Sequence, residues 1–366
     1  MKPNRVNKGD RAMSVQPTHN IEPARRDFYG RIGERNLAPL WEVLHKLVTA
    51  TPETQIVPHL WRYDALKPDL LEACELITAK EAERRVLVLE NPAMRGESRI
   101  TRSLFGGLQI ILPGEIAAPH RHTQAALRFV LEGEGAYTSV DGERTFMRPG
   151  DFVITPSWTW HDHGNVGNGP MVWLDGLDMH MIKLFEASFR EGSGSDAAGA
   201  VTRPEGDSEA RYGGNLLPVD DDYSRPTSPV FNYRYDRTRD ALEAMRRRDD
   251  WNPWHGLKLK YANPKTGDYA IPTIATFIQL LPKGFRTAPY RSTASTVFVG
   301  VEGGGKSVVG EGEGAQTFTW GPRDIFVVPS WEYVRHEADT DAVLFSYSDQ
   351  GVHEKLGFFR EQKLPS

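Results

Sequence analysis

The chain contains 366 residues, a length that fits two ordinary domains or a pair of fused repeats. Hydrophobic residues make up 39% and charged residues 25%, so a core can be buried and wholesale disorder is excluded. Lys and Arg number 44 against 49 Asp and Glu, and no basic run dominates, which argues against a nucleic-acid partner. No apolar stretch approaches the roughly 18 residues that span a bilayer, so no membrane partner is expected. The single cysteine, Cys74, fits a reducing cytoplasm.

The N-terminal part of the chain is expected to be helical after a polar start. Residues 1–26 show no apolar core of a secretory signal and are expected to form a flexible arm. Residues 27–85 are expected to form a helical N-terminal segment with two helices. Asn36 can cap the first helix, with Pro39 near its first turn, and the second is expected over residues 64–77.

The rest of the chain has the texture of β-structure. Residues 86–191 contain short β-type runs separated by Gly, Pro and Asp, the pattern of an antiparallel barrel or sandwich. Residues 192–250 are expected to be a linker, with a Gly- and Ser-rich loop and a short helix near 238–249. Residues 251–366 return to β-type runs.

An internal repeat relates the two β regions. One set of residues from the first β region recurs 170 positions later in the second, and another set recurs 173 positions later. A period this long indicates duplicated domains rather than a solenoid. The matched residues are Gly114, Pro119, Arg121, Thr123 and Gly133 with Gly284, Pro289, Arg291, Thr293 and Gly303, then Asp151, Pro156 and Trp158 with Asp324, Pro329 and Trp331.

The clearest candidate for a metal site is the pair His120 and His122. Residues two apart on a strand point to the same face, so both imidazoles project together. His161, on a later strand, can complete a set of three neutral imidazoles, which suits Fe, Zn, Cu and Ni. An HxH pair alone is a weak signal. Its place between Gly114 and a later Pro-Gly-Asp turn makes a metal site the favoured interpretation.

The spacing of these residues resembles the two motifs of the cupin superfamily, from about residue 86 to the C-terminus. The resemblance implies an all-β bicupin, two tandem double-stranded β-helix (jelly-roll) domains with N-terminal and linker helices. Residues 86–191 would be the metal-binding domain. One position departs from the motif, because Ala126 stands where cupins usually have a Glu ligand. A three-His site without a carboxylate keeps its full positive charge and would accept a dianionic chelating substrate.

The second repeat has lost the candidate ligands. Tyr290 and Ser292 replace the first two histidines, and Val334 replaces the third. His336 aligns with His163, which is not a candidate ligand, and a single histidine does not hold a metal tightly. Residues 251–366 are therefore expected to form a degenerate, structural cupin domain.

Arg128 and His163 are candidates for binding the substrate and for catalysis. Arg128 interrupts an apolar run, so it either lines the barrel and binds a carboxylate or extends outward from an edge strand. Its counterpart in the second repeat is Phe298, which favours a functional role. His163 follows His161 by two residues and can face a phenolic oxygen or O2, although a turn histidine is the competing interpretation.

Three further polar residues are candidates for substrate binding. Arg84 precedes the first β run, but either it or its neighbour Arg85 can lie on the surface. Gln109 recurs as Gln279, so a structural role in both repeats competes with substrate binding. Asp175 lies in an apolar run and is either a contact for a second ring hydroxyl or a turn carboxylate.

Longer runs around these residues resemble the gentisate 1,2-dioxygenases and their salicylate and 1-hydroxy-2-naphthoate relatives; they include ERRVLVLENP, PHRHTQAALRFVLEGEGAYT and TPSWTWHDHGN. The resemblance implies an Fe(II) enzyme, usually a homotetramer, that uses O2 to cleave an aromatic hydroxy acid such as gentisate. It implies that gentisate would give maleylpyruvate. The implied residues are the iron ligands His120, His122 and His161, and the substrate contacts Arg84, Gln109, Arg128, His163 and Asp175, with Arg128 and His163 as the catalytic pair.

Three alternatives stay open at this stage. A sister dioxygenase would share every ligand and differ only in pocket shape. A zinc or nickel cupin acting as an isomerase or hydrolase would not consume O2 with its substrate. A small-molecule sensor would usually carry a partner module with basic helices, and the sequence shows none.

Overall fold

The computed structural model describes residues 22–365 and divides the chain into two compact units, Met1–Thr51 and Pro52–Ser366. Within the first unit lie α1 (Pro23–Gly33) and α2 (Leu40–Leu47). Most of the expected flexible arm lies outside the described residues, but its last four residues are helical because α1 begins at Pro23. In the part of the chain described, no helix is both long and apolar enough to cross a membrane.

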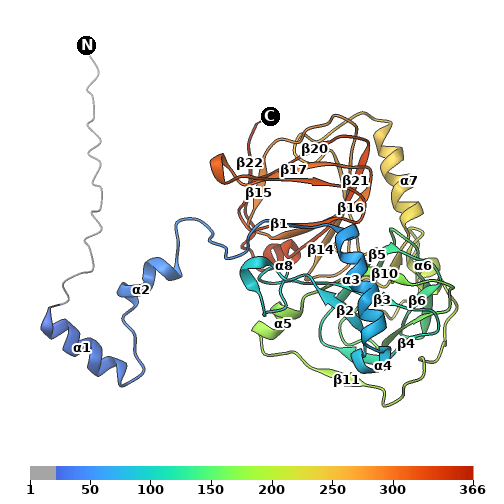
Figure 1. Cartoon of the computed structure of the whole chain (residues 1–366), viewed down its shortest axis with the longest axis horizontal. Coiled ribbons are helices and arrows are strands. Elements are labelled where there is room, and N and C mark those ends of the chain that lie inside the picture. The colour runs from blue at the N-terminus through green and yellow to red at the C-terminus, as the bar shows by residue number, and fades with distance from the viewer. Residues whose placement is uncertain (1–21, 366) are drawn as a thin grey trace, which may run out of the picture. The chain divides into compact units, whose positions relative to one another are not determined.

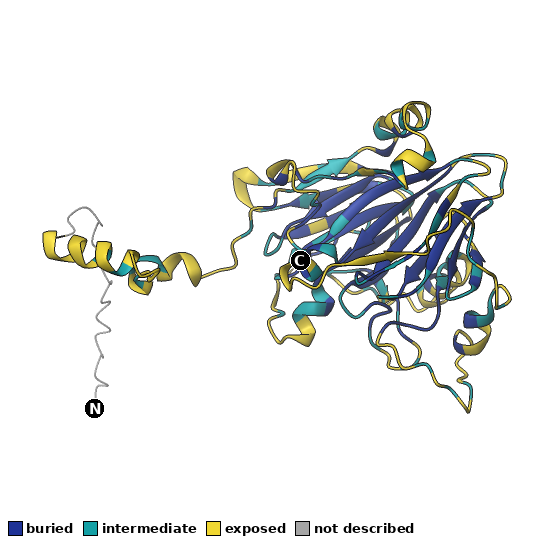
Figure 2. Cartoon of the chain, turned by 90° about the horizontal axis from the view of Figure 1, so that it is seen from below, coloured by how far each residue is buried: buried dark blue, intermediate teal, exposed yellow. Residues whose placement is uncertain are grey.

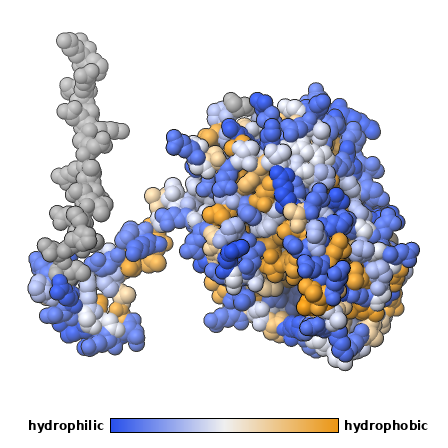
Figure 3. Space-filling view, viewed as in Figure 1, coloured by the Kyte–Doolittle hydropathy of each residue, from blue (hydrophilic) through white to orange (hydrophobic). Residues whose placement is uncertain are grey.

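The cap expected for the helix that begins near Pro39 is wrong. Asn36 has a φ of +57° and lies in the turn after α1, where its amide N–H donates to the Gly33 carbonyl. Asn tolerates this left-handed conformation better than most residues do, so it ends one helix instead of starting the next. Helix α2 begins after Pro39 and leaves apolar side chains such as Trp41 and Leu44 exposed. Figure 3 shows hydrophobic residues at the surface of this unit.

The second unit contains two β-barrels, and their strands are largely buried (Figures 1 and 2). The elements that make up the first barrel and its helices are α3 (Tyr63–Leu76), α4 (Ala79–Ala82), β2 (Arg85–Val88), η1 (Pro92–Met94), β3 (Phe105–Ile111), β4 (Ile116–His122), β5 (Ala126–Glu132), β6 (Ala136–Val140), β7 (Glu143–Phe146), β8 (Phe152–Thr155), β9 (His161–Asn165), β10 (Met171–Leu177), α5 (Met179–Leu184), β11 (Arg190–Gly192), α6 (Asp207–Tyr212) and β12 (Asn232–Tyr233).

The second barrel repeats this order of elements. It comprises β1 (His59–Trp61), α7 (Tyr235–Arg246), β13 (Leu257–Lys260), β14 (Ala275–Leu281), β15 (Tyr290–Ser292), β16 (Thr296–Glu302), β17 (Gly305–Val309), η2 (Gly312–Gly314), β18 (Gln316–Trp320), β19 (Ile325–Val328), β20 (Val334–Ala338), β21 (Ala342–Ser348), α8 (Gln350–Lys355) and β22 (Glu361–Lys363).

Each barrel consists of one six-stranded and one five-stranded antiparallel sheet. In the first barrel the strand orders are β12-β8-β5-β10-β3-β2 and β11-β4-β9-β6-β7. In the second they are β1-β19-β16-β21-β14-β13 and β18-β17-β20-β15-β22. The six-stranded orders match position by position, and the five-stranded orders match when the second is read from β22 to β18. This agrees with the internal repeat in the sequence.

The two barrels exchange a short strand with each other. Strand β1 leads through α3 into the first barrel, yet it pairs with β19 of the second. Strand β12 leads through α7 into the second barrel, yet it pairs with β8 of the first. The sequence did not predict this exchange, because β1 falls in residues 27–85, which were expected to be helical. The helix expected near 238–249 starts earlier, at Tyr235, directly after β12.

Reciprocal hydrogen bonds also join the barrels. Asp178 of the first barrel accepts a hydrogen bond from the Thr273 hydroxyl of the second at 2.6 Å. Asp349 of the second barrel accepts one from the Ser103 hydroxyl of the first. A shared hydrophobic core lies between the barrels, where the Phe129 and Phe345 rings stack with centroids 4.1 Å apart. The second barrel therefore supports the face of the sheet opposite to the one that carries the Arg128 side chain.

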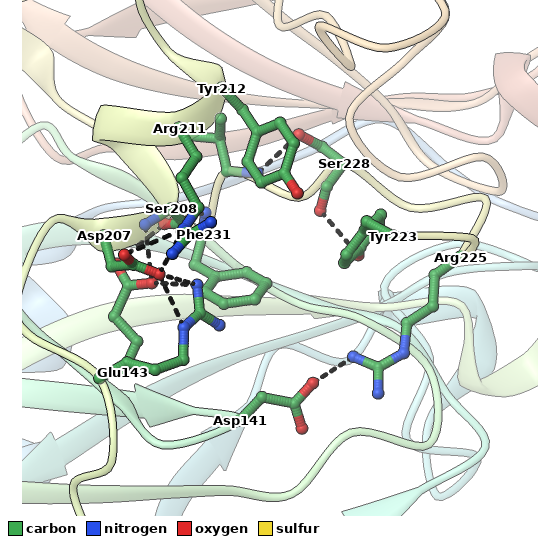
Figure 4. A network of polar contacts seen from close by, with 12 residues as sticks. Asp141, Glu143, Asp207, Ser208, Arg211, Tyr212, Tyr223, Arg225, Ser228 and Phe231 are labelled. Carbon is green, nitrogen blue, oxygen red and sulfur yellow. Dashed lines mark hydrogen bonds and ion pairs between the residues drawn. The ribbon is translucent and has the colours of Figure 1, made fainter. Parts of the chain in front are cut away.

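The stretch between the barrels is more ordered than a surface loop. The buried carboxylate of Glu143 accepts hydrogen bonds from the backbone and the side chain of Ser208, both at 2.9 Å, at the start of α6 (Figure 4). Arg203 pairs with the same carboxylate at 3.1 Å. These contacts fasten residues 203–212 of the expected linker to the outside of the first barrel.

Candidate metal centre

Three histidines from neighbouring strands meet inside the first barrel. Strand β4 pairs with β9 so that His120 lies opposite His161, and His122 follows two residues along the same face of β4. One ring nitrogen of each lies within 4.8 Å of the other two, and all three side chains are buried. Strand alternation thus brings together the three residues that the sequence predicts as ligands.

Each ring is held so that Nε2 faces its partners. The Nδ1 atoms donate to backbone carbonyls, which fixes the tautomer that leaves Nε2 with a free lone pair. The three Nε2 atoms are buried and have no hydrogen-bond partner. The Nδ1 hydrogen bonds run from His120 to Ala118 at 2.9 Å, from His122 to Gln124 at 2.9 Å and from His161 to Thr159 at 2.8 Å.

The surroundings keep the three imidazoles neutral. Burial, aided by the positive charge of Arg84, lowers the pKa of His120 to about 3 and that of His122 to about 4. Burial also lowers the pKa of His161 well below its usual value. A metal ligand must be the neutral imidazole, so these rings are ready to coordinate at neutral pH.

These observations fit a divalent metal bound by three nitrogen ligands. Buried polar atoms without a partner are costly, and three converging lone pairs are explained by a cation between them. Ala126, at the position of the usual Glu ligand, lies on the wall of the adjoining cavity. Its methyl group leaves space beside the histidines that a carboxylate side chain would fill.

The second barrel has no matching cluster. Tyr290 and Ser292 lie on β15, the counterpart of β4, and Val334 starts β20, the counterpart of β9. Among residues 22–365, the three histidines of the first barrel are the only group of three or more His, Cys, Asp or Glu side chains that can hold a metal ion.

A cavity of about 380 Å³ opens beside the histidines. Its wall includes His122, Arg84, Arg128 and Asp175, and the remaining wall is mostly apolar. An apolar cleft with a few converging polar groups is the usual form of a small-molecule site. The other residues that line it are Val86, Phe105, Gln124, Ala126, Leu177, Met179, Ser188, Phe189 and Arg190.

Arg128 faces the barrel interior rather than solvent. Its side chain is 2% exposed, which excludes the outward-extending alternative. One terminal nitrogen donates to the Thr155 hydroxyl at 2.7 Å and the other to Nε2 of His163 at 3.0 Å. Its Nε lies 3.6 Å from the Asp175 carboxylate and has no hydrogen-bond partner. The guanidinium is therefore fixed in position and still has N–H groups to offer a ligand.

His163 lies behind Arg128 and does not line the cavity. It is fully buried, accepts from Arg128 through Nε2, and makes a 2.9 Å hydrogen bond between Nδ1 and the Thr138 hydroxyl. Both ring nitrogens are thus occupied by the protein. This arrangement supports a role in positioning Arg128, and it offers no direct path for the predicted proton exchange with a substrate.

Asp175 occupies the middle of β10, not a turn. Its carboxylate accepts a hydrogen bond from Nε1 of Trp173 at 3.0 Å and lines the cavity. Burial raises its pKa, while the positive charges of Arg128 and Arg84 oppose that rise. Trp173 was not predicted as part of the site, although its spacing of two from Asp175 on a strand placed both on one face.

Arg84 and Arg85 have different environments. Arg84 lines the cavity, and burial lowers its pKa while Asp175 opposes this. Arg85 is buried against Glu115 and Cys74 and serves the structure of the barrel wall. Gln109 is 2% exposed but does not line the cavity, so the structure does not bring it to the candidate site.

Arg190 belongs to the cavity wall although the sequence did not predict it there. It lines the cavity and forms an ion pair with Glu83 at 2.7 Å. Phe189 and Ser188 beside it also line the wall. The sequence held one signal, because Phe189-Arg190-Glu191 recurs as Phe359-Arg360-Glu361, but a repeat does not show that a segment folds over a cavity.

Comparisons with known proteins agree with this geometry. The profile of the cupin domain family matches residues 107–177. Gentisate 1,2 dioxygenase 1 of Aquipseudomonas alcaligenes is 56% identical over 351 residues, which cover 96% of this chain and 100% of that protein. The 5-aminosalicylate 1,2-dioxygenase of a Comamonas species is 36% identical over 333 residues, covering 89% and 87%.

A solved structure shares the whole architecture. The salicylate 1,2-dioxygenase of Pseudoaminobacter salicylatoxidans, crystallised as an adduct with gentisate, is 33% identical and superposes with a TM-score of 0.87, covering 96% of this chain and 97% of that one. The prediction of an all-β bicupin is thereby confirmed. The chain belongs to the gentisate 1,2-dioxygenase family of bicupin ring-cleaving dioxygenases.

Proposed function

We propose that this chain is an Fe(II)-dependent gentisate 1,2-dioxygenase that converts gentisate and O2 to maleylpyruvate. The observation that carries the proposal is the three-His cluster without a carboxylate, set beside a cavity that three arginines line. The 56% identity to a gentisate 1,2-dioxygenase over nearly the whole chain supports gentisate as the ring. Fe(II) is chosen over zinc or nickel because ring cleavage uses O2.

His120, His122 and His161 would hold the iron. When bound, Fe(II) supplies the charge that chelates the carboxylate and 2-hydroxyl oxygens of the substrate and the electrons that activate O2. Three neutral ligands leave the metal's charge to be balanced by the substrate. The methyl group of Ala126 leaves room for this chelate next to the histidines.

The arginines would bind and orient the substrate carboxylate. Arg128 presents a planar, fixed N–H donor group, and Arg84 adds a second positive charge at the same cavity. His163 would hold Arg128 in place from behind. Asp175 would balance the arginine charge and accept a hydrogen bond from the 5-hydroxyl of gentisate. Gln109 is buried outside the cavity, so it would affect the bound substrate only indirectly, by packing in the barrel wall.

An oxygen-electrode assay tests this function. Protein reconstituted with Fe(II) should consume O2 with gentisate faster than with salicylate or 1-hydroxy-2-naphthoate, and the zinc-loaded protein should consume none. The 5-hydroxyl feeds electron density into the gentisate ring and eases its oxidation. Equal or faster turnover of salicylate would assign the chain to a sister enzyme. No O2 uptake with any of the three would contradict the proposal.

Asp175 gives a prediction about ring preference. A site that hydrogen-bonds a substrate hydroxyl discriminates against the analogue that lacks it, because its own polar group is left unpaired. We expect Asp175→Ala to lower kcat/KM for gentisate by roughly tenfold more than for salicylate, the worth of about one hydrogen bond to a charged group. The readout is the ratio of kcat/KM for gentisate to kcat/KM for salicylate. Arg128 loses its Asp175 partner in this variant, and that loss lowers kcat/KM for both substrates. An unchanged ratio would remove Asp175 from hydroxyl recognition.

We also propose the domain division, assembly and location that the family resemblance and composition suggest. Residues 86–191 would be the metal-binding cupin domain and residues 251–366 the structural one. The enzyme would be a cytoplasmic homotetramer. Sedimentation of the purified chain at four times the monomer mass would support this assembly, and a monomer would contradict it.

A further inference from the structure

The second barrel contains a small polar cavity of about 30 Å³ where the first barrel has its metal centre. Tyr290 and Ser292, the counterparts of the first two histidine ligands, form part of its wall. The other polar side chains in its wall are those of His255, Lys258, Gln279, Arg291, Thr296, Glu332, His336 and Gln350.

The cation in this cavity comes from a different strand than in the first barrel. Arg128 of the first barrel is replaced by Phe298, and its partner Asp175 is replaced by Ser346. Lys258 instead pairs in register with Gln279, just as Val86 pairs with Gln109 in the first barrel. The second barrel has therefore lost one charged pair at this position. Its cavity wall contains Lys258, Glu332 and Arg291, and the Arg291 guanidinium donates to Gln362.

Lys258 has no acidic partner. It forms no ion pair or hydrogen bond with any described residue, and its ammonium lies 4.3 Å above the Phe277 ring. The nearby Glu361 carboxylate is bound by the Tyr290 hydroxyl at 3.1 Å and by Lys363 at 2.6 Å. Burial lowers the pKa of Lys258 to about 8, which reflects the cost of its unbalanced charge.

Gln279 provides a second donor without an acceptor. Its side chain is 2% exposed, and its buried Nε2 has no hydrogen-bond partner. A buried amide left unpaired is costly, so such groups usually bind something. Lys258 and Gln279 both line this cavity, and an ammonium and an amide N–H are the donors that an anion requires.

We propose that the second barrel binds one small monovalent anion, a halide or a carboxylate of formate size, between Lys258 and Gln279. The cavity of about 30 Å³ holds only a few atoms, since a single water occupies about 10–15 Å³ of such a cavity. An aromatic acid does not fit there. The degenerate cupin domain thus keeps a ligand site at the position of the lost metal, with the charge of its ligand reversed.

Bromide tests the location of this site, because its anomalous scattering identifies it in crystals. Crystals of the native iron-loaded chain soaked in sodium bromide should show a bromide peak between the Lys258 ammonium and the Gln279 amide. This arm needs no variant and so does not depend on how a mutant folds. No peak at this position, at bromide concentrations that label other surface sites, would overturn the proposal.

Thermal unfolding tests the contribution of Lys258. Bromide should raise the Tm of the native enzyme by about 2 °C or more over an equal concentration of isethionate, an anion too large for the cavity. Lys258→Met should lose this difference. Lys260→Met, which removes an exposed lysine from the same strand, should keep it. A bromide effect that survives Lys258→Met would place the anion elsewhere and contradict the proposal.

Discussion

Replacing His120 by alanine is expected to abolish iron binding and ring cleavage together. Two histidines remain, and they offer too few ligands to retain Fe(II) against dialysis. A metal that binds and polarises the substrate contributes several kcal/mol to the transition state, so kcat/KM for gentisate should fall by at least about 1,000-fold. Elemental analysis of the dialysed variant, combined with the oxygen electrode, measures both effects.

A matched histidine substitution provides the control. His45→Ala removes an exposed imidazole from α2, far along the chain from the three ligands, and should retain iron and full activity. The circular dichroism of both variants should match the native spectrum, because the His120 ring makes only one hydrogen bond to the protein, from Nδ1 to the Ala118 carbonyl. Iron retained by His120→Ala at the native level would contradict the three-His site.

Replacing Arg128 by lysine is expected to weaken substrate binding strongly while preserving the charge. A lysine cannot reach both the Thr155 hydroxyl and His163, and it lacks the planar pair of N–H donors that matches a carboxylate. A hydrogen bond to a charged group is worth about 1.5–3 kcal/mol, so kcat/KM should fall roughly 10- to 150-fold. Steady-state kinetics with gentisate should show the loss mainly as a higher KM.

The iron content of Arg128→Lys separates binding from folding. It should equal that of the native protein, because Arg128 does not contact the three Nε2 atoms in the described structure. Arg286→Lys, an exchange at an exposed ion pair with Glu337, should leave KM unchanged. Native kinetics for Arg128→Lys would show that the substrate carboxylate binds elsewhere.

The metal cluster could be predicted from the sequence because its geometry is mostly local. His120 and His122 share a face by strand alternation. The spacing of the two cupin motifs indicates that His161 returns beside them. The orientation of Arg128 followed from its apolar neighbours and from Phe298 at the equivalent position. The structure brings the three histidines together, and His122 and Arg128 line the same cavity.

The position of His163 could not be predicted in the same way. Alternation from His161 indicates its face, but not that Arg128 would lie between it and the cavity. That arrangement depends on Thr138 and Thr155, whose hydroxyls hold the two side chains from neighbouring strands. Contacts between strands far apart in the sequence depend on register, and a single sequence does not fix register.

The exchange of β1 and β12 was missed for a related reason, although one signal was present. Arg62-Tyr63-Asp64 recurs as Arg234-Tyr235-Asp236, so the duplicated unit begins before residue 86. In both copies a buried aspartate of the other barrel, Asp324 or Asp151, accepts the tyrosine backbone N–H. The repeat indicates equivalent elements, but not that each would pair with the opposite barrel.

Titrating the metal-free protein with Fe(II) under anaerobic conditions, and assaying gentisate-dependent O2 uptake at each step, tests the central claim most directly. Only the first barrel has three histidines in reach of one another within the described chain. Activity should therefore rise linearly and stop rising at one iron per chain. A break at two irons per chain, or activity that is equal before any iron is added, would contradict the account.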